Sequence, residues 1–127
     1  MKMITLKPIE LKSAEINSAS SLISVDSRVF TCCDDQYALY ELQSDLSWLA
    51  HSWANAPVLP SDHHERKRLK PDFEMLLLNQ KNILLIPSGS KPNRNQALQF
   101  NLLTNRFSSI LLCCNWNFIS FNIKRFY

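Results

Sequence analysis

The chain has 127 residues, of which 46% are hydrophobic and 20% are charged. This length fits one domain, and the composition excludes a long disordered chain. Lys and Arg number 14 against 11 acidic residues, and a net charge of +3 is too small to indicate nucleic-acid binding.

The sequence shows no signal peptide, because no long apolar run follows the first residues. The most apolar stretch, residues 110–121, is interrupted by Asn115 and Asn117 and is too short to cross a bilayer. We therefore expect a cytoplasmic protein that has no membrane partner.

Short strands separated by turns are predicted through the first half of the chain. Residues 3–11 form a possible edge strand, and the small polar residues 17–21 predict a turn. Three segments rich in β-branched, aromatic and cysteine side chains predict strands: residues 22–25, 28–33 and 37–42. Residues 46–56 fit either a helix or an outer strand, and we favour the strand.

The same pattern returns after a polar segment, residues 61–71, which predicts a loop. Three more strands are predicted at residues 74–78, 83–86 and 96–103. The repeat has a period of about fifty residues, which is typical of propeller blades. We expect an all-β fold of antiparallel, propeller-like blades, with about two blades where a closed ring needs at least about four. Because only one glycine is present, the turns must depend on Asn, Asp and Ser.

The tail differs from the repeat. Residues 111–127 are dense in aromatic, Asn and Cys residues, whereas residues 1–110 carry the propeller-like pattern. One interpretation is a final pair of strands. The other is a truncated N-terminal portion of a longer protein, followed by a tail translated out of frame.

The four cysteines form two adjacent pairs, Cys32-Cys33 and Cys113-Cys114. This spacing fits neither a zinc site nor a secreted disulfide framework. Because neighbouring side chains on a strand point to opposite faces, we expect one cysteine of each pair to be buried and inert.

Asp72 and Glu74 are candidate metal ligands. If a strand begins here, their spacing puts both carboxylates on one face, where they can hold a hard cation such as calcium. The alternative is structural: Asp72 caps the turn at Pro71, and Glu74 pairs with Lys70 or Arg94.

The turn that follows residues 83–86 is a candidate anion site. Gly89 permits a positive φ, so that backbone amides converge on an anion. Ser88, Ser90, Lys91, Arg94 and Lys70 are the side chains that we expect to contribute. The alternative is an ordinary turn between two strands.

Two further polar groups are weaker candidates. His63 and His64 are adjacent in a predicted loop, where neighbouring histidines rarely hold one metal ion. Residues 66–70 are basic, but without interleaved aromatic residues they favour a solvated loop over nucleic-acid binding. The chain has no nucleophile elbow, dinucleotide fingerprint or zinc-protease motif.

Two motifs, Lys-Pro-Asp-Phe-Glu at residues 70–74 and Ser-Gly-Ser-Lys-Pro-Asn-Arg at residues 88–94, resemble a functionally uncharacterised bacterial family whose members look propeller-like. The resemblance covers residues 20–103. Asp72-Phe73-Glu74 is also distantly similar to a step in esterase-like phytase propellers, which have glycine where this chain has Met75. That similarity implies a phosphoester or another anionic ligand.

These observations predict an uncharacterised propeller-like protein with two alternative activities. One is a metal-assisted phosphoester or lactone hydrolase that uses Asp72 and Glu74. The other is a non-catalytic module that binds a small anionic ligand or a protein partner.

Overall fold

The computed structural model describes residues 16–112 of the chain, which contain eight strands, one α-helix and one 3-10 turn. The first four strands are β1 (Ala19–Val25), β2 (Arg28–Cys33), β3 (Ala38–Leu42) and β4 (Trp48–Ser52). The helix α1 (His63–Leu69) follows. The remaining strands are β5 (Phe73–Asn79), β6 (Asn82–Pro87), β7 (Gln96–Asn101) and β8 (Arg106–Leu111), and the 3-10 turn η1 (Pro92–Arg94) connects β6 to β7.

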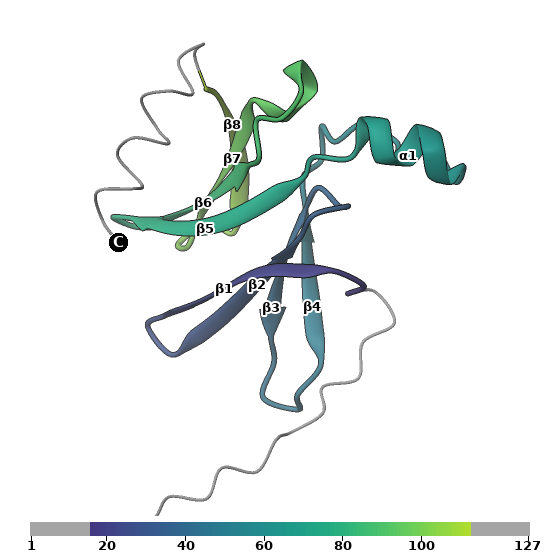
Figure 1. Ribbon diagram of the computed structural model, residues 1–127. Coiled ribbons are helices and arrows are strands. Elements are labelled where there is room, and N and C mark those ends of the chain that lie inside the picture. The colour runs from purple at the N-terminus through teal and green to yellow at the C-terminus, as the bar shows by residue number, and fades with distance from the viewer. Residues whose placement is uncertain (1–15, 113–127) are drawn as a thin grey trace, which may run out of the picture.

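The strands form two antiparallel sheets of four, each in sequential order. Sheet A contains β1 to β4, sheet B contains β5 to β8, and α1 connects them (Figure 1). The all-β class and the antiparallel repeat are therefore confirmed. Both sheets carry a register shift near the start of their first strand, between Ala19 and Ser21 and between Phe73 and Met75.

The predicted strands at residues 28–33, 74–78 and 83–86 are confirmed, and residues 46–56 contain an outer strand, as favoured. The predicted turn at residues 17–21 is wrong at its end, because β1 already begins at Ala19 and its first part pairs with β2. Strand β8 was not predicted, because its serines and its arginine interrupt the alternation of apolar and polar side chains. This strand is stabilised by its pairing with β7.

The loop predicted for residues 61–71 is also wrong, because α1 forms within it. Asp62 caps the helix by accepting a hydrogen bond from the Glu65 amide at 2.9 Å. The segment is rich in Arg, Lys, Glu and Leu, which favour helices, and Pro71 stops it. Among the described residues, no helix is long and apolar enough to cross a membrane.

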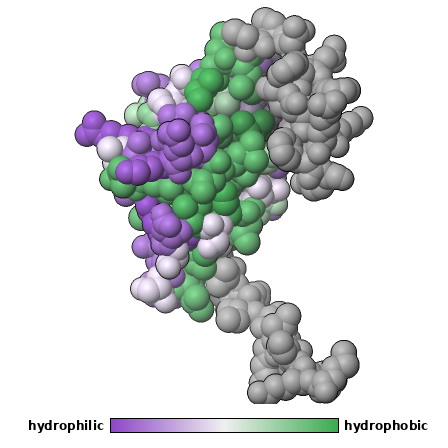
Figure 2. Space-filling model, turned by 90° about the vertical axis from the view of Figure 1, so that its left-hand side faces the viewer, coloured by the Kyte–Doolittle hydropathy of each residue, from purple (hydrophilic) through white to green (hydrophobic). Residues whose placement is uncertain are grey.

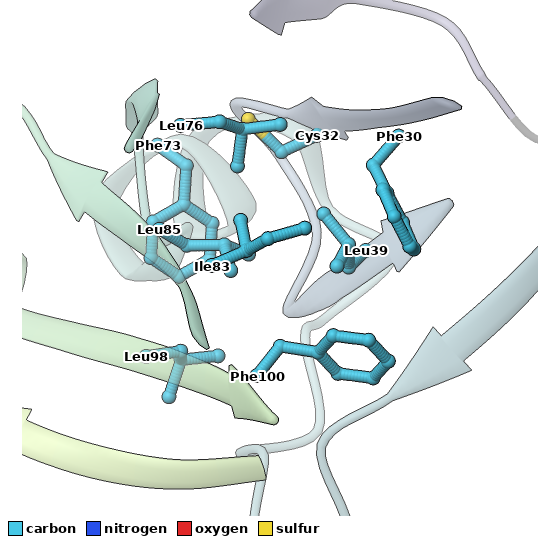
Figure 3. Packing of buried hydrophobic residues seen from close by; sticks show 9 residues of the cluster. All are labelled: Phe30, Cys32, Leu39, Phe73, Leu76, Ile83, Leu85, Leu98 and Phe100. Carbon is cyan, nitrogen blue, oxygen red and sulfur yellow. The ribbon is translucent and has the colours of Figure 1, made fainter. Parts of the chain in front are cut away.

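The main core lies between the two sheets (Figure 3). Its fully buried members come from β2 and β3 of sheet A and from all strands of sheet B except β8: Phe30, Cys32, Leu39, Phe73, Ile83, Leu85, Leu98 and Phe100. Phe30 and Phe100 meet edge to face across the two sheets, with ring centroids 5.9 Å apart. Burial of alternate side chains therefore fixes which face of each sheet points inward.

Sheet A is apolar on its second face as well. Cys33, Ala38 and Tyr40 are buried there, with Ile16 and Trp48 packed against them. Cys32 and Cys33 are both buried, one on each face, so burial extends beyond the one cysteine of the pair that was expected. Cys113 and Cys114 lie outside the described residues, as do the predicted strand at residues 3–11 and nearly all of the tail that begins at residue 111.

Residues other than glycine make most of the tight turns: Asp, Asn and Ser, as expected, but also Leu46, whose φ is 67° between β3 and β4. Asp26 and Ser27 both have positive φ, at 48° and 65°, in the two-residue turn between β1 and β2. Asn105 has a φ of 52° in the turn before β8. Asn and Asp tolerate this left-handed region better than other non-glycine residues do.

An ion-pair cluster joins the two sheets at one end of the core. Glu41 accepts hydrogen bonds from Arg28 Nε at 2.6 Å and from Arg28 Nη2 at 2.9 Å. His51 Nε2 lies 2.8 Å from the same carboxylate, and its ring packs 4.8 Å from that of Phe100. Because Arg28 also donates at 2.9 Å to the carbonyl of Leu102, in the turn between β7 and β8, this cluster connects the sheets.

The first strands of the two sheets present apolar surface. β1 and β5 have a hydrogen-bonded neighbour on one side only, within the described part of the chain. They carry exposed leucines, Leu22, Leu77 and Leu78. Figure 2 shows a band of apolar atoms between polar patches on one side of the molecule. Ser20 and Ser21 of β1 form hydrogen bonds with the backbone of β5, so the two edges lie against each other.

Candidate functional site

Five of the predicted site residues, Lys70, Asp72, Ser88, Ser90 and Arg94, lie in one hydrogen-bonded cluster around the carboxylate of Asp72, immediately before β5. Arg94 Nη1 donates to Asp72 Oδ2 at 2.8 Å, and Ser88 Oγ donates to the same oxygen at 2.5 Å. Lys70 Nζ lies 3.2 Å from Asp72 Oδ1. Asp72 has a positive φ of 59°. We call Asp34, Lys70, Asp72, Ser88, Ser90 and Arg94 the Asp72 cluster.

The turn between β6 and η1 supplies the two serines of this cluster. Ser88 Oγ and Ser90 Oγ are 2.9 Å apart, and Arg94 Nη1 donates to Ser90 Oγ at 2.8 Å. Gly89 between them has a φ of 67°, in the left-handed region that the sequence predicted for it. The turn therefore folds back so that Ser88 and Arg94 contact the Asp72 carboxylate, while Ser90 contacts Ser88 and Arg94.

Lys70 connects this turn to sheet A. Its ammonium lies 2.5 Å from Asp34 Oδ2, and Ser18 Oγ donates to Asp34 Oδ1 at 2.6 Å. The Asp72 amide also donates to the Asp34 carbonyl at 2.7 Å. Residues far apart in the sequence thus hold the start of β5 against the turn that follows β2.

Arg94 also fixes the position of α1. Its side chain is only 8% exposed, and Nη2 donates to the Lys67 carbonyl at 2.7 Å. Tyr37 Oη makes a longer hydrogen bond of 3.4 Å to the Leu69 carbonyl. The last turn of α1 is therefore held by side chains from both sheets.

The ionisation of the cluster follows from these contacts. Burial raises the pKa of Asp72, but hydrogen bonds from Ser88 and Lys70 and the charge of Arg94 outweigh it, so the pKa is lowered. For Asp34 too, burial is outweighed by Lys70 and Ser18, and the pKa is lowered. Burial lowers the pKa of Lys70, but the two carboxylates raise it further than burial lowers it.

The charges of the cluster therefore balance. Two carboxylates, Asp34 and Asp72, face two cations, Lys70 and Arg94. Arg94 binds the carboxylate of Asp72, whereas the sequence predicted that it would bind an external anion. This arrangement is suited to holding three segments together, because each charge already has an opposite charge beside it.

Two predicted residues are not among the contacts of this cluster. Glu74 is exposed on β5, and its charge contributes to the raised pKa of the Cys32 thiol. Because β5 begins only at Phe73 and Asp72 has left-handed backbone, the two-residue alternation does not extend back to Asp72. Lys91 is exposed at the start of η1. Within residues 16–112 no three His, Cys, Asp or Glu side chains are grouped to hold a metal ion, and the metal site stays a prediction.

A pocket of about 290 Å³ lies next to the cluster, between α1 and the turn after β2. Its basic lining consists of His63, Arg66, Lys67 and Lys70. Its other lining residues are Ser18, Asp34 and Asp35. Arg66 is held by a hydrogen bond from Nη2 to the Asp35 carbonyl at 3.2 Å. Lys70 is thus the only predicted anion-binding residue that lines this pocket.

Sequence reasoning missed Asp34 and Asp35 as site residues. Their pattern, two acidic residues directly after a buried strand, had been assigned only to a turn. The buried Asp35 Oδ1 has no hydrogen-bond partner among the described residues, so it can accept a hydrogen bond from a ligand. Only the folded chain shows that this turn faces α1, because 27 residues or more separate the two segments.

Comparison with known proteins gives one match. A family model described as a family of unknown function (DUF6929) matches residues 15–115. No curated protein and no solved structure matches the chain.

Proposed function

We propose that this chain, a member of the DUF6929 family of unknown function, is a non-catalytic module that binds a small anion in the pocket beside α1. The pocket brings three cationic side chains, Arg66, Lys67 and Lys70, together with His63. This gathering of basic groups around a hollow is the observation that carries the proposal.

The charges in the pocket favour an anion over a cation. Asp34 is paired with Lys70 at 2.5 Å and accepts from Ser18, so this ion pair is neutral, and Arg66 and Lys67 remain against the single carboxylate of Asp35. Lys67 is exposed, and its ammonium can turn toward a ligand. Arg66 uses one nitrogen for the Asp35 carbonyl, and a guanidinium has five N–H donors in total. An anion that also carries a hydroxyl would satisfy Asp35 Oδ1.

Binding without turnover is better supported than hydrolysis. A hydrolase at Asp72 would need this carboxylate free to bind a metal or to take up a proton. Arg94, Lys70 and Ser88 already engage both of its oxygens. Release of Asp72 would leave Arg94 buried without its opposite charge. Breaking a buried ion pair in this way destabilises a fold by about 3 kcal/mol or more.

The arrangement of the sheets supports a propeller-like architecture for this module. β1 and β5, the first strands of their sheets, are joined by side chains. Ser20 Oγ donates to the Phe73 carbonyl at 2.5 Å, and the Leu76 amide donates to Ser21 Oγ at 3.0 Å. The sheets pack face to face through the core behind these strands. Adjacent blades of a propeller pack in this way around the axis.

The proposal is tested by calorimetry, in which inorganic phosphate or acetate is titrated into the intact chain and the affinity is measured. Lys67→Gln should weaken binding about fivefold or more, because it removes one positive charge from the pocket. Lys91→Gln is the matched control, since this exposed lysine does not line the pocket and should leave affinity unchanged. An effect of Lys91→Gln but none of Lys67→Gln would reject the pocket in favour of the turn at residues 88–94.

A further inference from the structure

The pocket beside α1 contains a buried acceptor that lacks a donor among the described residues. Within residues 16–112, three buried side-chain atoms have no hydrogen-bond partner: Asp35 Oδ1, Asn82 Oδ1 and Arg94 Nε. Of these three residues, Asp35 alone lines the pocket. A buried acceptor without a donor is unfavourable, because it has lost its contact with water and gained no bond in return. A ligand that brings a donor to Asp35 therefore removes this penalty when it binds.

Asp35 is held in position by the bonds of its turn. The Asp34 amide donates to the Ser18 carbonyl at 3.3 Å, and the Asp34 carbonyl accepts from the Asp72 amide at 2.7 Å. On the other side, the Asp35 carbonyl accepts from Arg66 Nη2 at 3.2 Å. These bonds anchor the backbone of the turn before a ligand arrives. They also place the guanidinium beside Asp35, so an anion that is bound by Arg66 lies close to this residue.

Donors and an acceptor thus line the same pocket. Arg66 and Lys67 can only donate hydrogen bonds, whereas the carboxylate of Asp35 can only accept them. An oxyanion without a proton would satisfy the two cations but would set its own lone pairs against Asp35. An oxyanion that keeps one proton satisfies both kinds of group, because its hydroxyl donates while its other oxygens accept.

We infer that the pocket selects inorganic phosphate over sulfate, with a P–OH group donating to Asp35 Oδ1 and the other oxygens accepting from Arg66 and Lys67. This inference rests on the proposed function and names the ligand of that site. Phosphate and sulfate share a tetrahedral shape, but near neutral pH phosphate keeps at least one proton and sulfate keeps none. The pocket volume of about 290 Å³ admits an ion of this size.

Carboxylates fit the pocket less well than phosphate does. Acetate has no hydroxyl for Asp35. Glycolate, a 2-hydroxycarboxylate, has one, but only two oxygens then remain for Arg66, Lys67 and Lys70. Phosphate offers three oxygens besides its hydroxyl, one for each of these cations. Lys70 contacts Asp34 and Asp72, and its ammonium keeps a third N–H for a ligand.

The experiment titrates phosphate and sulfate into the intact chain by calorimetry. At about pH 8.5, above the second pKa of a phosphate group, both ions are dianions and differ only in the proton. We expect phosphate to bind about tenfold tighter, which is the usual gain from a hydrogen bond to a charged group. Asp35→Asn should reduce this advantage to about twofold or less, since the neutral amide accepts more weakly and its NH₂ group can donate to sulfate. Glu65→Gln is the matched control and should keep the advantage, because this exposed carboxylate of α1 does not line the pocket.

The outcomes separate the two proposals. Equal affinity for phosphate and sulfate, with both weakened by Lys67→Gln, overturns this inference and leaves the small-anion pocket standing. An advantage for phosphate that survives Asp35→Asn also overturns it, and tighter binding of glycolate than of phosphate overturns phosphate as the ligand. Failure of phosphate, sulfate and acetate to bind overturns the proposed function together with this inference. Circular dichroism and a thermal melt establish that each variant is folded. If Asp35→Asn does not fold, the comparison of the two ions on the wild-type chain decides alone.

Discussion

Arg94 Nη1 lies 2.8 Å from Asp72 Oδ2, although 22 residues separate the two in the chain. The pair holds the turn after β6 against the start of β5, and Arg94 also reaches the Lys67 carbonyl of α1. One ion pair thus fixes the segment that carries the proposed basic pocket.

Asp72→Asn should lower the free energy of unfolding by about 3 kcal/mol, because it leaves Arg94 and Lys70 partly buried beside a neutral group. Glu74→Gln is the matched control and should change stability by less than about 0.5 kcal/mol, since Glu74 is exposed. Urea denaturation measures both. Equal losses in the two variants would mean that the cluster does not stabilise the fold.

Calcium should leave the thermal melting temperature of the chain unchanged. A calcium ion at Asp72 would have to displace Arg94 or Lys70, and Glu74 is not among the contacts of the Asp72 carboxylate. Melts with and without millimolar calcium measure this. An upward shift that both Asp72→Asn and Glu74→Gln abolish would instead establish the predicted metal site, because a ligand of the folded state raises its melting temperature.

Glu41 should make the chain sensitive to acid. The hydrogen bond from Arg28, together with the hydrogen bond from His51 and the charges of both residues, outweighs burial and lowers the pKa of Glu41 from 4.5 to about 2. A lowered pKa in the folded state gives stability that is present above pH 4.5 and is lost as the pH falls toward 2. Asp34 and Asp72, whose pKa values are also lowered, add to this loss below their ordinary value of 3.8.

The contribution of Glu41 is isolated by comparing the wild-type chain with Glu41→Gln. At neutral pH the variant should be less stable by about 2 kcal/mol, because Arg28 loses its charged partner. This difference should shrink as the pH falls from 4.5 to 2, since protonation then neutralises the wild-type carboxyl group as well. A difference that is constant across this range would show that the ion pair contributes nothing.

Cys32 should react slowly with thiol reagents in the folded chain. Burial raises the pKa of its thiol to about 11, although a hydrogen bond with Ser20 opposes this shift, and the side chain is fully buried in the core. The thiolate is the reactive form. Mass spectrometry of the peptide that contains Cys32 after brief labelling should show modification only when urea is added. Rapid labelling of native protein would mean that the sheets separate readily.

Asp62→Ala should weaken both α1 and the binding of an anion. Loss of the hydrogen bond to the Glu65 amide destabilises the first turn of α1 by about 1 kcal/mol. Because His63, Arg66 and Lys67 are all on α1, its fraying lowers the affinity for phosphate. Ser61→Ala, one residue earlier and exposed, is the control for calorimetry. Unchanged affinity in the Asp62 variant would remove α1 from the proposed site.

Part of the candidate site was predictable from the sequence. Ser88, Lys70 and Arg94 were expected to bind a ligand anion, and in the fold they contact the carboxylate of Asp72, while Ser90 contacts Ser88 and Arg94. Binding of an external anion by these residues stays a prediction. The contact with Asp72 was not predictable, because it depends on the position of β5 beside the turn after β6. Asp34 and Asp35 were missed for the same reason. Their turn meets α1 only once both sheets have packed.

The sequence by itself determined that this chain forms short antiparallel strands in two similar groups. Alternation of apolar and polar side chains and the placing of Asp, Asn and Ser in turns are local properties, and they specify strands and hairpins wherever the chain lies. Sequence also determined the left-handed turn at Gly89, because a residue without a side chain tolerates a φ of 67°.

Only the tertiary structure decided which charges meet. Side chains of Asp34, Lys70, Asp72 and Arg94 come from segments that touch because the cores of sheets A and B pack on each other. The hydrophobic effect that drives this packing has no direction, so the pairing of surface charges is set by the register and the position of the sheets rather than by spacing in the chain. The basic pocket beside α1 is a consequence of that packing.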